Sequence, residues 1–267
     1  MELFFRKIGA GDPLIILHGL YGSSDNWYSI GRALADNYEV FMIDLRNHGN
    51  SPHSPEHNYT IMCDDLVDFL ARNQIDRAAF LGHSMGGKTA LAFGLKNPDK
   101  VSRMIVVDIS PFEYDLAHSK VAILHQGIMQ GMQSIEPEKI ADRREADAMM
   151  KKFVSEATIR QFLLKNLKRD PKGRFYWALN LPVLARNMTG IFSGLIPRNG
   201  NGPLNISHFP LLFIRGEYSG YLNKKDEEAI RYLLPWAQII TIPKSGHWVH
   251  AEQPVAFLQE IRRFMES

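Results

Sequence analysis

Short apolar runs rich in β-branched residues alternate along the chain with longer segments in which apolar residues recur every three or four positions. Continuous apolar runs of this length are typical of strands buried on both faces of a parallel sheet, and parallel strands need helical crossovers between them. The alternation therefore predicts an α/β fold, a mostly parallel sheet flanked by helices. The predicted strands are residues 14–19, 40–45, 78–84, 104–110, 211–216 and 238–243, with 3–8 as an edge strand. The predicted covering helices are residues 26–36, 59–73, 86–96, 224–233 and 254–265.

The strand rhythm stops at Pro111, where the sequence becomes helical and charged. A chain of 267 residues is long enough for one core domain with an insertion. We therefore predict a core of residues 1–110 and 208–267, with residues 111–207 as a helical cap inserted between core strands. Within this cap, residues 138–174 carry more Lys and Arg than Asp and Glu, which fits either a solvated helical face or a patch that attracts acidic substrates.

The strongest local motif is residues 82–86, GHSMG, which follow an apolar strand and lead into a helix. G-x-S-x-G in this strand–turn–helix context is the nucleophile elbow, a sharp turn that exposes the serine hydroxyl. Glycine is needed at Gly82 and Gly86 because side chains at these positions would clash in so tight a turn. The motif predicts Ser84 as a nucleophile; the alternative is a tight turn without chemistry.

A serine hydroxyl is a weak nucleophile until a base removes its proton, so a histidine is needed elsewhere in the chain. His247 follows the last predicted strand and precedes the last helix, where a loop at the carboxyl edge of the sheet points back at Ser84. We therefore predict His247 as the general base. We expect His18 to brace its loop and His250 to pack near the site or support its residues from behind, and we expect the side chain of His83 to leave the elbow in another direction.

Four motifs together resemble the α/β-hydrolase superfamily: HGLYGSSDNW at 18–27, DLRNHGNSP at 44–52, GHSMGG at 82–87 and SGHWVHAEQP at 245–254. More narrowly, they resemble YbfF-type bacterial esterases and their mitochondrial relatives. The resemblance covers the core and is weak across the cap. It implies the α/β-hydrolase fold, with an eight-stranded, mostly parallel sheet, a helical cap and no cofactor.

The carboxylate that should orient the base is missing from its usual place in this superfamily. Most members carry it as G-x-x-D after the strand that here ends at Gly216, and this chain has Ser219 at that position. The YbfF-type branch resembles a different arrangement, with the acid after the preceding strand, where this chain has Asp108. This assignment keeps the Ser–acid–His order of the fold. Glu217, close to the usual place, stays open as the alternative acid.

An acyl-transfer site also needs two N–H donors for the oxyanion that forms on the carbonyl. The fold supplies them from the backbone, and we predict the amides of Met85, directly after the nucleophile, and of Leu20, after the first core strand. In the segment that follows, we expect Asp44 to pair with Arg46 and hold a loop near the site. Five cap residues either line an acyl pocket or form the cap's own core: Phe175, Tyr176, Trp177, Leu181 and Phe192.

Together these residues predict a serine hydrolase of the carboxylesterase or thioesterase type (EC 3.1), with Ser84, Asp108 and His247 as its catalytic triad. Its substrate would be a small-molecule acyl ester or thioester, cleaved through an acyl-enzyme at Ser84. Two alternatives stay open: a carbon–carbon bond hydrolase or lyase on the same triad, and a non-catalytic member that binds a small ligand. Haloalkane dehalogenases and epoxide hydrolases are disfavoured because those relatives have aspartate at the elbow.

Composition limits the partners. A formal net charge of +2 gives no overall field that would gather nucleic acid or anionic membrane. There is no apolar run long enough to span a membrane, and the amino terminus lacks the pattern of a secretory signal, so we expect a cytoplasmic protein without stable membrane insertion. The histidines and carboxylates show no metal-ligand spacing, so neither a metal nor a cofactor is expected. The sequence does not predict the oligomeric state.

Overall fold

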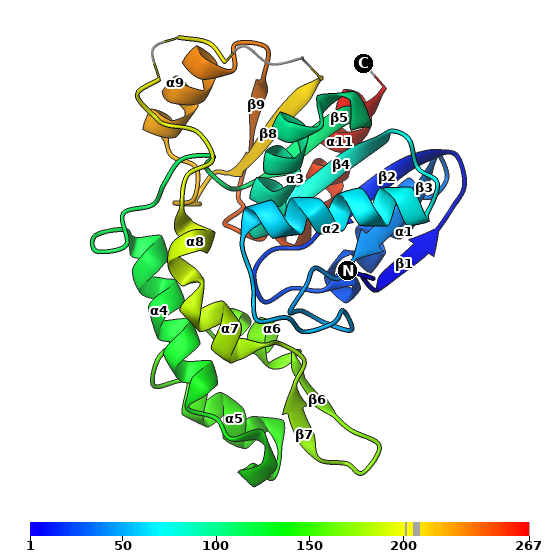
Figure 1. Cartoon of the computed structure of the whole chain (residues 1–267). Coiled ribbons are helices and arrows are strands. Elements are labelled where there is room, and N and C mark those ends of the chain that lie inside the picture. The colour runs from blue at the N-terminus through cyan, green and yellow to red at the C-terminus, as the bar shows by residue number, and fades with distance from the viewer. Residues whose placement is uncertain (201, 205–208, 267) are drawn as a thin grey trace.

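The computed structural model describes residues 1–200, 202–204 and 209–266, and its main element is a seven-stranded sheet in the order β1-β3-β2-β4-β5-β8-β9 (Figure 1). The predicted α/β class is confirmed, since only the edge strand β1 runs antiparallel to its neighbour, β3. The resemblance implied eight strands, and the described residues contribute seven to this sheet. The strands are β1 (Phe5–Ile8), β2 (Asp12–Leu17), β3 (Tyr38–Ile43), β4 (Ala78–His83), β5 (Val101–Val107), β8 (Leu211–Gly216) and β9 (Gln238–Ile242).

Helices cover both faces of this sheet (Figure 1). Successive residues of a strand point to opposite faces, so Ile15 packs into the core with α2 and α3, and Ile16 into the core with α1 and α11. Burial on both faces explains the continuous apolar runs of the strands. The helices lie close to their predicted positions: α1 (Tyr28–Leu34), α2 (Tyr59–Arg72), α3 (Met85–Lys96), α9 (Lys224–Leu233), α10 (Val249–Glu252) and α11 (Pro254–Met265), with a 3-10 turn, η1 (Ser24–Trp27).

Between β5 and β8 the chain forms a group of shorter elements beside the sheet (Figure 1). It contains a hairpin, β6 paired with β7, where the sequence predicted helices alone. Strands of three residues are too short to show a period, which is why the pattern missed them. The division of the chain into core and cap stays a prediction, and its boundary at 207 and 208 lies outside the described residues. The elements are α4 (Lys120–Gln133), α5 (Arg143–Met150), α6 (Ala157–Leu164), β6 (Leu167–Arg169), β7 (Phe175–Trp177), α7 (Leu181–Arg186) and α8 (Met188–Phe192).

Within the described ranges, the structure contains no helix with both the length and the apolar character needed to cross a membrane.

A fully buried lysine on α3, Lys88, connects the inserted segment to the core. Its Nζ donates to the carbonyl oxygens of Phe112, at 3.0 Å, and Ser193, at 2.5 Å. Phe112 follows β5 and Ser193 follows α8, so the Lys88 side chain holds the start of the inserted segment and the turn after α8 against α3. Burial disfavours its charge and lowers the pKa of Lys88 to about 7.

This lysine makes the stability of the fold depend on pH. In the unfolded chain a lysine keeps its proton up to about pH 10, so between about pH 7 and pH 10 the unfolded state binds more protons than the folded state. We therefore expect the free energy of unfolding to increase with pH over this interval. The increase should be smaller in Lys88→Met, and urea unfolding of both proteins at several pH values measures it. Equal slopes in the two proteins would contradict the role of Lys88.

Candidate active site

The predicted site residues gather at the carboxyl ends of the parallel strands. Ser84 directly follows β4, Asp108 directly follows β5, and His247 lies in the loop after β9. The sheet hydrogen bonding continues into two of these turns, because the Ser84 amide donates to Val107 O at 2.9 Å and the Asp108 amide to Ile214 O at 2.7 Å. Side chains distant in the sequence therefore meet at one edge, as ligand sites of α/β sheets commonly do.

The turn at Ser84 has the geometry that the motif predicted. Its backbone has φ 52° and ψ −122°, an unfavourable conformation for a residue with a Cβ atom. A Cβ on Gly86 would lie 2.4 Å from Leu17 O, and a Cβ on Gly82 would lie 2.3 Å from Gly86 O. Both glycines are therefore required by the close approach of the backbone, and the serine stands at the amino terminus of α3.

The carboxylate of Asp108 is fully buried and has three hydrogen-bond partners. Its Oδ2 lies 2.7 Å from His247 Nδ1 and also accepts the hydroxyl of Ser219, while its Oδ1 accepts the Gly216 amide at 2.9 Å. With Asp108 ionised, Nδ1 of His247 must carry the proton, which leaves Nε2 as the acceptor. This tautomer is the one that a general base needs.

Glu217, the alternative acid, lies elsewhere. Its Oε2 accepts the backbone amide of Lys244 at 2.8 Å, and this carboxylate is exposed. Among the described residues it makes no hydrogen bond with His247. The geometry thus brings Asp108, and not Glu217, to the imidazole.

Burial governs the charges of this pair. Burial raises the pKa of Asp108, and the hydrogen bonds from Ser219 and Gly216 partly offset this rise. Burial also lowers the pKa of His247. A lowered pKa keeps the imidazole neutral near neutral pH, while the carboxylate of Asp108 stabilises the protonated imidazole that forms when His247 accepts a proton.

Ser84 and His247 line one cavity of about 30 Å³. No hydrogen bond joins their side chains in the part of the chain that the structure describes; such contacts often tighten only when substrate binds. Leu20 and Met85 line a second cavity beside Ser84, of about 20 Å³. Neither of their amides has an acceptor among the described residues, so both N–H groups are available to an oxyanion at Ser84.

Three residues around the imidazole were not found from the sequence. The Tyr221 ring stacks on His247 with centroids 3.5 Å apart and planes 11° from parallel. The Tyr221 hydroxyl lies 2.8 Å from Nε2 of His125 on α4, and Nδ1 of His125 lies 3.3 Å from the Tyr21 hydroxyl. These contacts join segments about a hundred residues apart, and no local pattern signals them.

Three further histidines near the site make structural contacts. His18 Nε2 accepts the Leu45 amide at 2.9 Å and braces its loop. His250 stacks on Trp27 with centroids 4.1 Å apart. Nε2 of His83 lies 2.8 Å from the carbonyl oxygen of His247, so His83 supports the loop that carries the base.

The expected pairing of Asp44 with Arg46 is wrong. Arg46 forms a buried two-point ion pair with Asp65 of α2, at 2.6 and 2.8 Å. Asp44 instead accepts the backbone amides of Ser24 and Asn50, at 2.6 and 2.8 Å. Asp44 is the carboxylate closest to Arg46 in the sequence. Helix α2, however, places the carboxylate of Asp65 where it can form a bidentate pair with Arg46.

The cap aromatics divide between the two roles that the sequence left open. Phe192 lines the cavity beside Ser84, together with Ile191 of the same helix. Phe175 and Leu181 are buried in the apolar core instead, Trp177 is partly buried against it, and Tyr176 is exposed.

Within the described ranges, histidine, cysteine and carboxylate side chains form no cluster of three that could hold a metal ion.

The chain is similar to known proteins over most of its length. A family model described as alpha/beta hydrolase fold matches residues 12–254. The chain is 34% identical over 255 residues to "Esterase YbfF" of Escherichia coli (strain K12), covering 96% of this chain and 93% of that one. It is 39% identical over 259 residues to "sn-1-specific diacylglycerol lipase ABHD11" of Mus musculus, covering 94% and 80%. A solved structure described as "Marine microorganism esterase" matches with a TM-score of 0.92 and 42% identity, covering 98% and 99%.

The stacking of Tyr221 on His247 should control how readily Ser84 reacts. Tyr221→Leu fills the space but cannot stack on the imidazole, and we expect labelling of Ser84 by a fluorophosphonate to slow about tenfold, the scale of one lost aromatic contact. Tyr221→Phe keeps the ring and serves as the matched control, with a smaller effect. Labelling rates followed by intact-protein mass spectrometry measure this, and wild-type labelling of Tyr221→Leu would refute the role.

Proposed function

The chain belongs to the alpha/beta hydrolase family, and we propose that it hydrolyses carboxylic esters or acyl thioesters through an acyl-enzyme on Ser84. Membership places it among hydrolases of class EC 3.1, since relatives over most of its length are described as an esterase and a lipase. The proposal adds to this the mechanism and its residues, with Ser84 as nucleophile, His247 as base and Asp108 as the group that orients His247. The observation that carries it is the hydrogen bond to Asp108 from His247, which lines the same cavity as Ser84.

In the first half of the proposed reaction, Nε2 of His247 takes the hydroxyl proton while Ser84 Oγ attacks the substrate carbonyl. The negative charge that develops on the carbonyl oxygen is stabilised by the amides of Leu20 and Met85, each worth about 3 kcal/mol. His247 then gives its proton to the leaving alcohol or thiol. The carbon–oxygen or carbon–sulfur bond breaks and the acyl group stays on Ser84.

In the second half, water enters in place of the leaving group. His247 removes a proton from the water, which attacks the acyl carbon, and then returns a proton to Ser84 Oγ. The products are a carboxylic acid and the free enzyme, so no redox partner or cofactor takes part. Apolar side chains around the cavity beside Ser84, including Ile109, Ile191 and Phe192, suit the acyl part of such a substrate.

Labelling and turnover test this proposal together. We expect a fluorophosphonate to label the wild-type protein at Ser84, and the protein to release p-nitrophenol from short-chain p-nitrophenyl esters or thiol from acyl thioesters. Ser84→Ala should lose labelling and at least about 10⁴-fold in kcat, because the nucleophile is absent. Tight binding of a small ligand without labelling or turnover would favour a non-catalytic pocket.

The identity of the acid has its own test. Asp108→Asn should lower kcat by about 10⁴-fold, because an amide stabilises the wrong tautomer of the imidazole. Glu217→Gln is the matched control and should stay within about tenfold of the wild type, since Glu217 caps only the Lys244 amide. Steady-state kinetics on one ester substrate measures both, and the reverse ranking would overturn the assignment of Asp108.

A further inference from the structure

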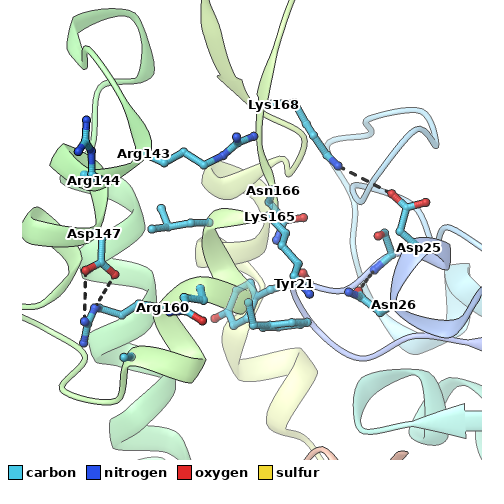
Figure 2. A pocket seen from close by; sticks show the side chains of 15 residues that line it. Tyr21, Asp25, Asn26, Arg143, Arg144, Asp147, Arg160, Lys165, Asn166 and Lys168 are labelled. Carbon is cyan, nitrogen blue, oxygen red and sulfur yellow. Dashed lines mark hydrogen bonds and ion pairs between the residues drawn. The ribbon is translucent and has the colours of Figure 1, made fainter. Parts of the chain in front are cut away.

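A cavity of about 700 Å³ lies between the inserted segment and the loop after β2 (Figure 2). Figure 2 shows Arg143, Arg144 and Arg160 on one side of it, and Asp25 and Asn26 of the core loop on the other. This volume is in the range of small-molecule sites, whereas the cavities at Ser84 hold little more than one water molecule each. The substrate therefore needs space beyond the cavities at Ser84, and this cavity provides it.

The cavity shares a wall with the site at Ser84. Tyr21, Asn26 and Phe162 line both this cavity and the one that contains Ser84 and His247. These three side chains therefore lie between the active-site cavity and the larger cavity. A substrate held at Ser84 and extending past Tyr21 would enter the larger cavity.

The walls of this cavity are strongly cationic. Five basic side chains from three elements and their ends converge on it, against two carboxylates. The basic residues are Arg143 and Arg144 of α5, Arg160 of α6, Lys165 at the end of α6, and Lys168 of β6. For residues 138–174 the sequence left open a solvated face or a patch that attracts acidic substrates. Arg143, Arg144 and Lys165 are exposed to solvent, but they line one cavity together with Arg160 and Lys168. Their convergence on one cavity favours the binding of an acidic group.

Carboxylates neutralise part of this charge, because Arg144 pairs with Asp142 at 3.1 Å and the two carboxylates of the cavity also have cationic partners. Asp147 is held by Arg160 through two hydrogen bonds, at 2.8 and 3.2 Å. Asp25 is bonded by Arg6 at 2.7 Å and lies 3.8 Å from Lys168.

Two cations are left for a ligand. Arg143 is steadied by donation to the carbonyl oxygen of Leu167 at 2.7 Å and by its position over the Phe175 ring. Among the described residues, neither Arg143 nor Lys165 has a carboxylate partner. An arginine held in place and a lysine that lines the same cavity are well suited to bind the oxygens of a phosphate or carboxylate.

We propose that this cavity, the cap-side anion site, binds a phosphate or carboxylate group on the substrate, at a distance from the bond that is cleaved. The inference rests on the proposed ester hydrolysis and names the substrate class within it: an anionic ester whose charged end lies against Arg143 and Lys165. The anionic group of the substrate takes no part in the cleavage of the ester bond. It holds the substrate so that the acyl carbonyl lies at Ser84, and it selects anionic esters over neutral ones of the same length.

Paired substrates test the site, and two pairs distinguish the sources of the anion. The first pair is p-nitrophenyl hexanoate and mono-p-nitrophenyl adipate, which differ by a carboxylate at the end of the acyl chain. The second pair is the butyryl esters of glycerol and of glycerol 3-phosphate, which differ by a phosphate on the leaving group. For each pair, the ratio of kcat/KM for the anionic ester to that for the neutral ester is measured in wild type and variants.

In at least one pair, we expect this ratio to fall about tenfold in Arg143→Gln/Lys165→Gln, the scale of one lost charge-assisted hydrogen bond. Lys151→Gln/Lys152→Gln removes the same charge from exposed positions of the cap outside the cavity and should keep the wild-type ratio. If the double variant does not fold, Lys165→Gln alone repeats the test, since Lys165 is exposed. The ratio of kcat/KM values should also be lower in this variant than in the wild type. In the wild type, raising the ionic strength should lower the ratio, because salt screens exposed charges.

Ratios that are equal in wild type and Arg143→Gln/Lys165→Gln for both pairs would overturn the site while leaving the proposed function intact, since neutral esters would still be hydrolysed. A ratio that falls equally in Lys151→Gln/Lys152→Gln would also overturn it, because the effect would then come from net charge alone. Failure to hydrolyse any ester, together with no fluorophosphonate labelling, would refute the proposed function and this inference with it.

Discussion

The hydrogen bond between Asp108 and His247 is the contact on which the proposed chemistry depends. It joins the turn after β5 to the loop after β9, across the end of β8, which lies between them in the sheet. The turn after β8 helps to hold the acid, because the Gly216 amide and the Ser219 hydroxyl both donate to Asp108. Ser219 stands where most members of this superfamily carry the acid, and here it donates a hydrogen bond to Asp108.

Among the described residues, three of the six non-glycine residues with positive φ lie at the candidate site. Ser84 and Asp108 have φ values of 52° and 49°, and Tyr21, on the loop that faces them, has 64°. Each such conformation costs about 1–3 kcal/mol and persists only where the surrounding structure enforces it. Here the enforcement comes from buried strands whose hydrogen bonding extends into the turns at Ser84 and Asp108. The side chains are therefore held at fixed positions before any substrate binds, which favours catalysis.

Much of the core and of the candidate site could be predicted from the sequence, because those features depend on local patterns. The strands of the sheet are recognisable as apolar runs. The elbow at Ser84 is recognisable as a motif because its two glycines are required for steric reasons. What could not be predicted depends on long-range contacts. Arg46 has Asp65 as its partner because a helix brings it there, and the stacking of Tyr221 on His247 depends on two loops meeting. The cationic cavity could not be predicted either, because the number of basic residues does not show that they line one cavity.

The orientation of His247 by Asp108 can be observed directly by proton nuclear magnetic resonance in water. An imidazole N–H that donates to a buried carboxylate gives a resonance far downfield of ordinary amides, because the hydrogen bond is charge-assisted and shielded from exchange. We expect this resonance in the wild-type protein and in Glu217→Gln, and its loss in Asp108→Ala. A resonance that survives in Asp108→Ala and disappears in Glu217→Gln would contradict the assignment of Asp108 as the acid.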